Sequence, residues 1–170
     1  MARTERLTVD LANYPELVVI YLGMKVNSLR GVGTMLKFGP EINRSVEAKP
    51  EGLLRHEGLL YSLWPLHIGM RQYWRDFPSL ETWARTLPHQ TWWQTFLKNP
   101  AGTGFWHEVY TNHGGIEAVY DNMDIRPGLS AFAEVKPARG PMFGARSRLG
   151  LAGHAPPSPL PENQYYAREK

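Results

Sequence analysis

The stretch Gly104-Phe-Trp-His-Glu-Val-Tyr110 decides the fold, because it alternates like a β-strand and carries an imidazole next to a carboxylate. Successive side chains of a strand point to opposite faces. We therefore expect Trp106 and Glu108 on one face and His107 on the other. A strand with these residues is suited to line a pocket, although aromatic residues are also ordinary core material.

The segments around this stretch predict a single domain built from alternating strands and helices. The β-branched and apolar run Leu17–Met24 predicts the first strand. Apolar residues at helical spacing predict a helix over Val32–Lys49, with a kink or a division into two helical pieces at Gly39-Pro40. The remaining predicted strands cover Leu53–Trp64, His67–Trp74, Thr103–Tyr110 and, as a short strand, Ile116–Asn122. A helical region is predicted over Asp76–Lys98, with Ser79 as its N-cap, and Pro88 divides it into helices over 79–87 and 88–97.

The resulting order β-α-β-β-α-β predicts an α+β fold of the ferredoxin-like type, with helices on one face of a single sheet. The other face is left bare, and such faces commonly pair between subunits, so we expect a homodimer. We expect residues 1–15 to form an N-terminal arm and 16–135 the domain. Residues 136–170 form a Pro/Gly-rich C-terminal arm, since six of the fourteen Pro fall within 137–170.

Composition excludes several classes of protein. The 170 residues carry a net charge of +3, and the excess lies in the C-terminal arm, so a structured basic face for nucleic acid is not expected. The apolar run that ends at Met24 is too short to span a membrane. The sequence has no Cys, which excludes disulfides and thiolate sites. No basic segment followed by an apolar one opens the chain, and we expect a cytoplasmic protein.

His107 and Glu108 are the first candidates for chemistry. Because they point to opposite faces, one is expected to face a cavity between sheet and helices as a proton shuttle or hydrogen-bond anchor. The structural alternative is that His107 is a satisfied core histidine and Glu108 pairs with Arg71 across the sheet.

His89 is the second candidate, because it shares a helical face with Trp93 and Phe96, with Trp92 alongside. A position in the first turn after Pro88 favours the neutral imidazole, which could act as a base or as a haem ligand. Packing against aromatic residues is the structural alternative. Asn27, at the end of the first strand, could hold a substrate oxygen or cap a turn. No close spacing of metal ligands is present, so we expect no metal site.

Several motifs together resemble a family of small bacterial and fungal proteins grouped as monooxygenase-like, after a fungal member in terpenoid biosynthesis. The resemblance covers residues from about 15 to 135. It rests on Gly23-Met24-Lys25-Val26-Asn27, Gln72-Tyr73-Trp74-Arg75, Gly104–Tyr110, Glu117–Met123 and Gly128-Leu129.

This resemblance implies a dimeric α+β barrel, as in the antibiotic-biosynthesis monooxygenases. Those enzymes oxidise lipophilic substrates, many of them with no metal or flavin, and other relatives on the fold bind haem. The resemblance therefore implies that no cofactor is needed, with haem as the alternative.

Taken together, these features predict a tailoring monooxygenase that acts on a lipophilic small molecule in secondary metabolism. A His base, an oxyanion donor and a dry apolar pocket would be required. The candidates are His107 or His89 as base, Asn27, Tyr73 and Trp106 as donors, and Met24, Trp74, Trp92, Trp93 and Phe96 as walls. The alternatives are a haem enzyme of the same fold, aldoxime-dehydratase-like or haem-degrading, with His89 or His107 as axial ligand. A non-oxidative cyclase, isomerase or ligand-binding protein is the third possibility.

Overall fold

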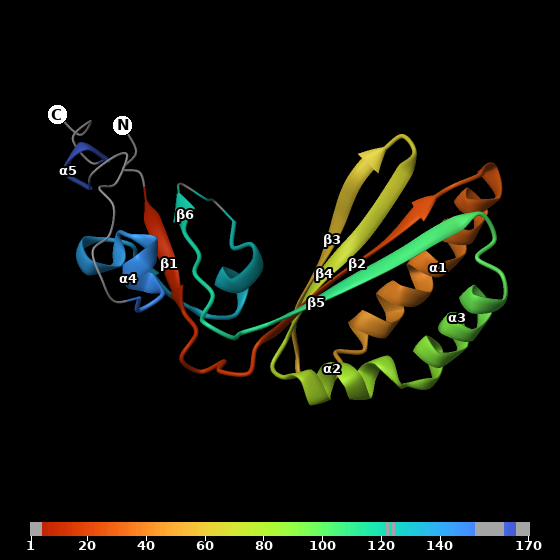
Figure 1. Ribbon diagram of the computed structural model, residues 1–170, viewed down its shortest axis with the longest axis horizontal. Coiled ribbons are helices and arrows are strands. Elements are labelled where there is room, and N and C mark those ends of the chain that lie inside the picture. The colour runs from red at the N-terminus through yellow and green to blue at the C-terminus, as the bar shows by residue number, and fades with distance from the viewer. Residues whose placement is uncertain (1–4, 122, 124, 152–161, 166–170) are drawn as a thin grey trace. The chain divides into compact units, whose positions relative to one another are not determined.

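The computed structural model describes residues 5–121, 123, 125–151 and 162–165, which Figure 1 draws as coloured ribbon. The chain divides into two compact units. Residues Glu16–Thr111 form the first, which we call the sheet unit. Residues Met1–Pro15 and Asn112–Lys170 form the second, which we call the terminal unit.

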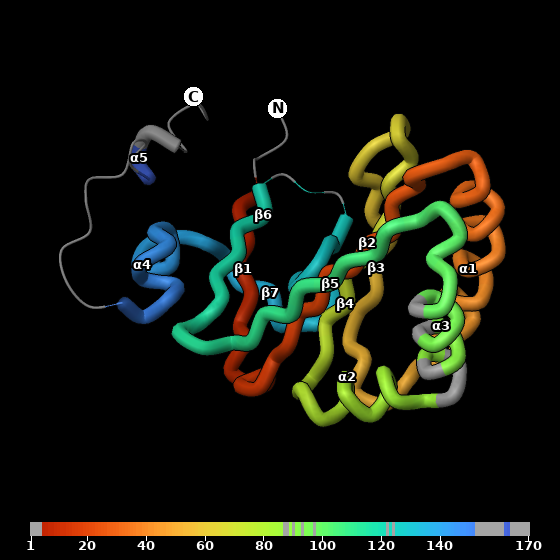
Figure 2. Tube along the Cα trace, turned by 45° about the vertical axis from the view of Figure 1, so that its right-hand side comes forward, coloured from red at the N-terminus to blue at the C-terminus, as the bar shows by residue number. Residues whose placement is uncertain are grey.

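The sheet unit has the ferredoxin-like plan that the sequence predicts. Its four strands pair antiparallel in the order β3-β4-β2-β5, so the two central strands are β4 and β2. Figures 1 and 2 show the helices on one side of this sheet. The elements are β2 (Val18–Val26), α1 (Leu29–Glu47), β3 (Leu53–Leu63), β4 (Leu66–Trp74), α2 (Phe77–Ala84), α3 (Leu87–Lys98) and β5 (Thr103–Thr111).

The two faces of the sheet follow from the strand register. Trp74 packs with Val18 and with Leu80 and Trp83 of α2, so the row that contains Trp74 faces the helices. We call this side the helix face and the opposite side the open face. On the helix face lie Val18, Ile20, Leu22, Met24, Ile68, Met70, Gln72, Trp74, Phe105, His107 and Val109. On the open face lie Val19, Tyr21, His67, Arg71, Tyr73, Trp106, Glu108 and Tyr110.

The helices differ from the predicted ones at their ends. Helix α1 runs without a break through Pro40, at the cost of one backbone hydrogen bond, so it is not divided into two pieces there. Asp76, and not Ser79, is the N-cap of α2, because its carboxylate accepts the backbone N–H of Ser79 at 2.7 Å. The predicted division near Pro88 is confirmed, with Pro88 in the first turn of α3.

The terminal unit contains a second sheet that the sequence did not predict. Strand β1 (Arg6–Asp10) lies between β6 (Tyr120–Asp121) and β7 (Glu134–Pro137) and pairs antiparallel with both. The segments expected to be arms therefore contribute strands. Within the short strand expected over residues 116–122, the described residues Tyr120–Asp121 form β6 and pair with β1, and Asn122 lies outside the described residues.

The described part of the terminal unit also contains short helices. These are η1 (Gly128–Ala131), η2 (Gly140–Met142), α4 (Ala145–Arg148) and α5 (Glu162–Tyr165). The domain expected over residues 16–135 begins where the sheet unit begins, while residues 112–135 belong to the terminal unit. Among the described residues, no helix is both long and apolar enough to cross a membrane.

Candidate functional site

Strand β5 places His107 on the helix face, as the alternation of its sequence predicts. His107 lies across β2 from Met70, with Leu22 between them. The ring of Phe105, two residues earlier, lies 6.0 Å from that of His107 and 6.0 Å from that of Phe96 on α3. Helix α3 thus faces β5 at this point, and an exposed imidazole lies beside an aromatic pair.

The helix face is closed at one end and incompletely packed along its middle rows. At the α2 end Val18, Trp74 and Leu80 are at most 4% exposed. Leu22, Met24, Ile68, Met70 and Phe105 also face the helices, but all remain only half-buried. Apolar surface in contact with water costs roughly 25 cal/mol per Å². This accessible apolar surface is therefore a favourable place for a lipophilic ligand.

His89 lies in the first turn of α3 within a cluster of aromatic rings. Its ring centroid is 3.8 Å from that of Trp83 and 4.7 Å from that of Trp92. Burial lowers the pKa of His89 to about 4, so the imidazole is neutral at physiological pH. Its Nδ1 is buried, with no hydrogen-bond partner among the described residues. Because its pKa is low, His89 is a poor base at neutral pH, and its ring is better suited to form part of an aromatic wall.

Three of the predicted site residues lie on the open face, away from His107. Trp106 donates its indole N–H to Nε2 of His67 at 2.8 Å, so this N–H is already engaged. Tyr73 is 5% exposed and its ring lies against the guanidinium of Arg71. Glu108 accepts a hydrogen bond from the hydroxyl of Tyr110. Strand alternation separates these groups from the helix face.

The alternative partner proposed for Glu108 is also not found. Arg71 pairs with Glu57 of β3 at 2.6 Å and donates a hydrogen bond to the hydroxyl of Tyr21 at 3.1 Å. Tyr21 lies between Arg71 and Glu108 in the register, which keeps the carboxylate of Glu108 one strand further away.

The other predicted residues fall in different surroundings. Trp74 is fully buried core, and its indole N–H is used within the protein. Asn27 is exposed at the junction of β2 and α1, where its backbone N–H bonds Gly102. Met24 and Trp92 are half-buried. The side chain of Trp93 lies outside the described residues.

Sequence reasoning missed His56 and Gln72, which form a polar pair on the helix face. Gln72 is fully buried, and its side-chain nitrogen lies 3.3 Å from Nδ1 of His56. A simple alternation from Leu53, which faces the helices, would place His56 on the open face. A register shift between Leu53 and Arg55 reverses this alternation. The available signal was Gln72, a polar residue with apolar residues, Met70 and Trp74, two positions before and after it in the strand Leu66–Trp74.

His89 does not fit the role of a haem ligand well. A histidine that binds a metal usually donates its second ring N–H to an acceptor. The buried Nδ1 of His89 has no such acceptor among the described residues. As a separate matter, the described residues contain no group of three or more His, Cys, Asp or Glu side chains that could hold a metal ion.

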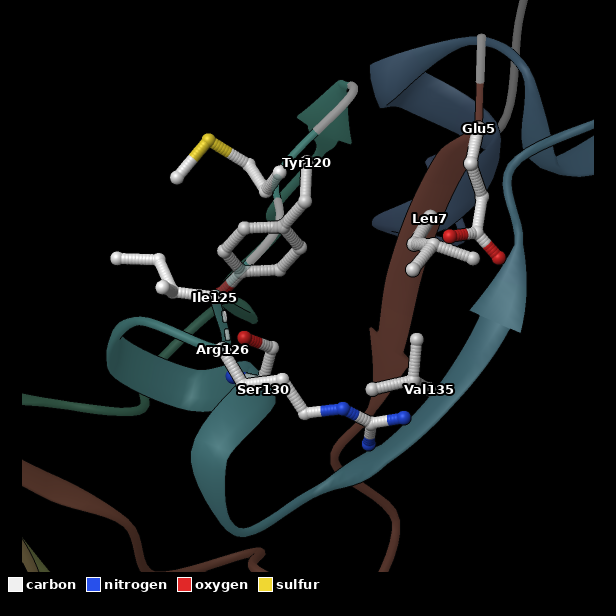
Figure 3. A pocket seen from close by; sticks show the side chains of 8 residues that line it. Glu5, Leu7, Tyr120, Ile125, Arg126, Ser130 and Val135 are labelled. Carbon is white, nitrogen blue, oxygen red and sulfur yellow. Dashed lines mark hydrogen bonds between the residues drawn. The ribbon is translucent and has the colours of Figure 1, made fainter. Parts of the chain in front are cut away.

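The terminal unit has a pocket of its own, of about 130 Å³, which Figure 3 shows. The guanidinium of Arg126 and the carboxylate of Glu5 point into the same space from two sides. The lining residues are Glu5, Leu7, Tyr120, Met123, Ile125, Arg126, Ser130 and Val135. None of the predicted site residues is among them.

Comparison with known proteins identifies a family. The sequence model described as Monooxygenase af470-like matches residues 17–129. No curated protein matches the chain significantly.

Solved structures show the fold. Aldoxime dehydratase OxdRE in complex with butyraldoxime is 18% identical, with a TM-score of 0.63 over 78% of this chain and 38% of that chain. A second aldoxime dehydratase is 20% identical, with the same TM-score, over 78% of this chain and 39% of that chain. The present chain thus spans about two fifths of these proteins. SnoaB, a cofactor-independent oxygenase from Streptomyces nogalater, is 14% identical, with a TM-score of 0.44 over 58% of this chain and 94% of that chain.

Proposed function

Because the chain belongs to the monooxygenase af470-like family, we propose that it is a tailoring monooxygenase for a lipophilic small molecule in secondary metabolism. The observation that carries this proposal is the accessible apolar surface of the helix face beside an exposed imidazole. Met24 and Phe105 line this surface from the sheet, and Phe96 lines it from α3.

His107 is the proposed base. Its imidazole is exposed and lies on the same face as the apolar surface, whereas His89 is held neutral by its aromatic surroundings. Imidazole is the usual general base near neutral pH. His89, Trp92 and Phe96 then act as walls that keep water from the substrate.

The chemistry proposed for this site needs no external reductant. His107 removes the proton of an acidic phenol, and the electron-rich anion reacts with dioxygen at a ring carbon. Loss of water leaves a quinone, so one oxygen atom enters the product and the other leaves as water. The substrate supplies all four electrons, since a phenol and one dioxygen give one quinone and one water.

Oxygen uptake tests this proposal directly. A panel of phenols led by 1-naphthol should show uptake of one dioxygen for each quinone formed. His107→Gln should retain its fold by circular dichroism and lose about two to four orders of magnitude in rate, the usual contribution of a general base. Turnover that continues without oxygen would instead indicate an isomerase or cyclase.

The same preparation is tested for bound haem by its absorption spectrum. The proposal predicts that activity survives in protein without a Soret absorption band. Activity that appears only when haem is added, and that is lost in His89→Ala or His107→Ala, would favour a haem enzyme of the same fold.

A homodimer formed through the open face accompanies the proposal. The face presents Tyr21, Arg71 and Tyr110 without a covering helix of the sheet unit. Sedimentation of the intact protein tests this, and a monomer at micromolar concentration would contradict it.

A further inference from the structure

A fully buried amide lies in the otherwise mostly apolar helix face. Gln72 has no exposed surface, and burying an amide is costly unless its hydrogen bonds are made. Both ends are satisfied by side chains. The oxygen of Gln72 accepts the indole N–H of Trp74 at 3.1 Å, and its nitrogen lies 3.3 Å from Nδ1 of His56.

This arrangement fixes the position of the proton on His56. An indole nitrogen can only donate, so the atom of Gln72 that faces Trp74 must be the oxygen. The other atom is then the NH₂ group, which donates to Nδ1 of His56. Since Nδ1 accepts, the neutral imidazole carries its proton on Nε2. Burial lowers the pKa of His56, which is consistent with a neutral ring.

The register shift in β3 brings this imidazole to the helix face. His56 pairs directly with Gln72, and Leu53 pairs with Trp74, so four residues of β3 lie opposite three of β4. Bulges often redirect a side chain toward a site. Among the described residues, Nε2 of His56 has no hydrogen-bond partner. The Nε2–H of His56 is thus a donor of fixed tautomer on the same face of the sheet as the accessible apolar surface.

We propose that His56 is a further substrate-binding residue, whose Nε2–H donates a hydrogen bond to an oxygen of the substrate, and that Gln72 is its positioning residue. This rests on the proposed function of the helix face.

The location of His56 also defines the class of substrate. His56 is on one edge strand, β3, and His107 is on the other, β5. Three strand spacings of about 4.8 Å separate the two edges by roughly 14 Å. The substrate is therefore elongated, with a hydroxyl or carbonyl oxygen at the end remote from His107.

Binding of two matched probes tests this inference on the full-length protein. 4-Phenylphenol and 4-methylbiphenyl have nearly the same shape, but only the first has a hydroxyl group. Quenching of Trp fluorescence should show that wild type binds 4-phenylphenol roughly three- to tenfold more tightly, the effect of one hydrogen bond. In a His107→Phe background, where the hydroxyl cannot bind the proposed base, His56→Phe should abolish this preference and leave the affinity for 4-methylbiphenyl unchanged. His113→Phe, in the terminal unit, is the matched control and should keep the preference.

The tautomer provides a second readout that does not depend on activity. Nitrogen-15 NMR of wild type should show His56 protonated at Nε2. Gln72→Met should produce a tautomer mixture and lower the preference for 4-phenylphenol. Should this variant fail to fold, His56→Phe and the wild-type spectrum still decide the matter.

Each outcome has a distinct meaning. A preference that persists when His56→Phe is made in the His107→Phe background, or a wild-type spectrum with the proton on Nδ1, would overturn the role of His56. Equal wild-type binding of both probes would also overturn it, while the lipophilic site would stand. Binding of neither probe to wild type would overturn both the role of His56 and the proposed function.

Discussion

Trp106 donates its indole N–H to Nε2 of His67 at 2.8 Å, and this bond places both residues on the open face. The ring of Tyr61 stacks on His67 at 4.7 Å and meets Trp106 edge-on at 5.5 Å. The cluster is thus a structural element of the open face, and a role for Trp106 in the site on the helix face is not supported by its position.

Loss of this hydrogen bond should affect stability and leave ligand binding unchanged. Trp106→Phe keeps most of the apolar contact and removes the donor, so we expect the free energy of unfolding to fall by about 1 kcal/mol in urea. Affinity for 4-phenylphenol should not change. Trp92→Ala, in the proposed wall, should weaken that affinity at least threefold. Equal effects of the two variants on binding would contradict the assignment of faces.

Gly23 lies under Trp106 because no larger residue fits there. A Cβ atom at this position would lie 2.6 Å from Nε1 of Trp106. Gly23→Ala should therefore displace the indole and destabilise the protein by about 1–3 kcal/mol. Gly33→Ala, in α1 with nothing within 4 Å, is the matched control and should stabilise by roughly 0.5–1 kcal/mol. A neutral Gly23→Ala variant would show that Trp106 does not lie flat on β2.

The observed N-cap of α2 is Asp76 and the predicted one was Ser79, and substitutions at the two positions distinguish them. Asp76→Ala removes the acceptor for the backbone N–H of Ser79 and should cost about 1 kcal/mol of stability. Ser79→Ala leaves that acceptor in place, so its effect should stay within roughly 0.5 kcal/mol. Thermal or urea unfolding measures both, and the reverse order would restore Ser79 as the cap.

Stability should depend on pH through His89. Its pKa is lowered to about 4 in the folded state, whereas an unfolded histidine titrates near 6.5. Between these values the unfolded chain binds more protons, so stability falls as pH falls from about 6.5 to about 4. The slope should be at most about 1 kcal/mol per pH unit, because partial exposure reduces the effect.

His89→Phe removes the contribution of His89 to this dependence, leaves that of His56, and keeps an aromatic ring between Trp83 and Trp92. The variant should gain stability relative to wild type as the pH is lowered through this window. His113→Phe is the control, because it replaces a histidine and leaves His89 in place. Parallel curves of stability against pH for His89→Phe and wild type would mean that the pKa of His89 is not lowered in the folded protein.

Alternation predicted much of the sheet unit, because local patterns carry that information. The opposite orientations of His107 and Glu108 follow from a regular strand, and the structure confirms them. His56 could not be placed in this way, because one extra residue in β3 reverses the alternation. The position of that bulge depends on the partner strand and not on the local sequence.

The terminal unit was missed for a different reason. Strand β1 pairs with segments more than 100 residues away, and such pairing has no local signal. Its central residue, Thr8, is 1% exposed and donates its hydroxyl to the carbonyl of Ala118 at 2.8 Å. A buried polar residue in a short, mixed segment does not resemble a strand until its partner is known.

The location of a lipophilic ligand tests the central claim most directly. Methyl NMR of protein labelled at its six Met can follow a titration with 4-phenylphenol. Met24 and Met70 face the helices beside His107, while Met123 lines the pocket of the terminal unit. The account predicts that the signals of Met24 and Met70 shift and that those of Met123 and Met142 do not. Shifts confined to Met123, or none at Met24 and Met70, would contradict a site on the helix face.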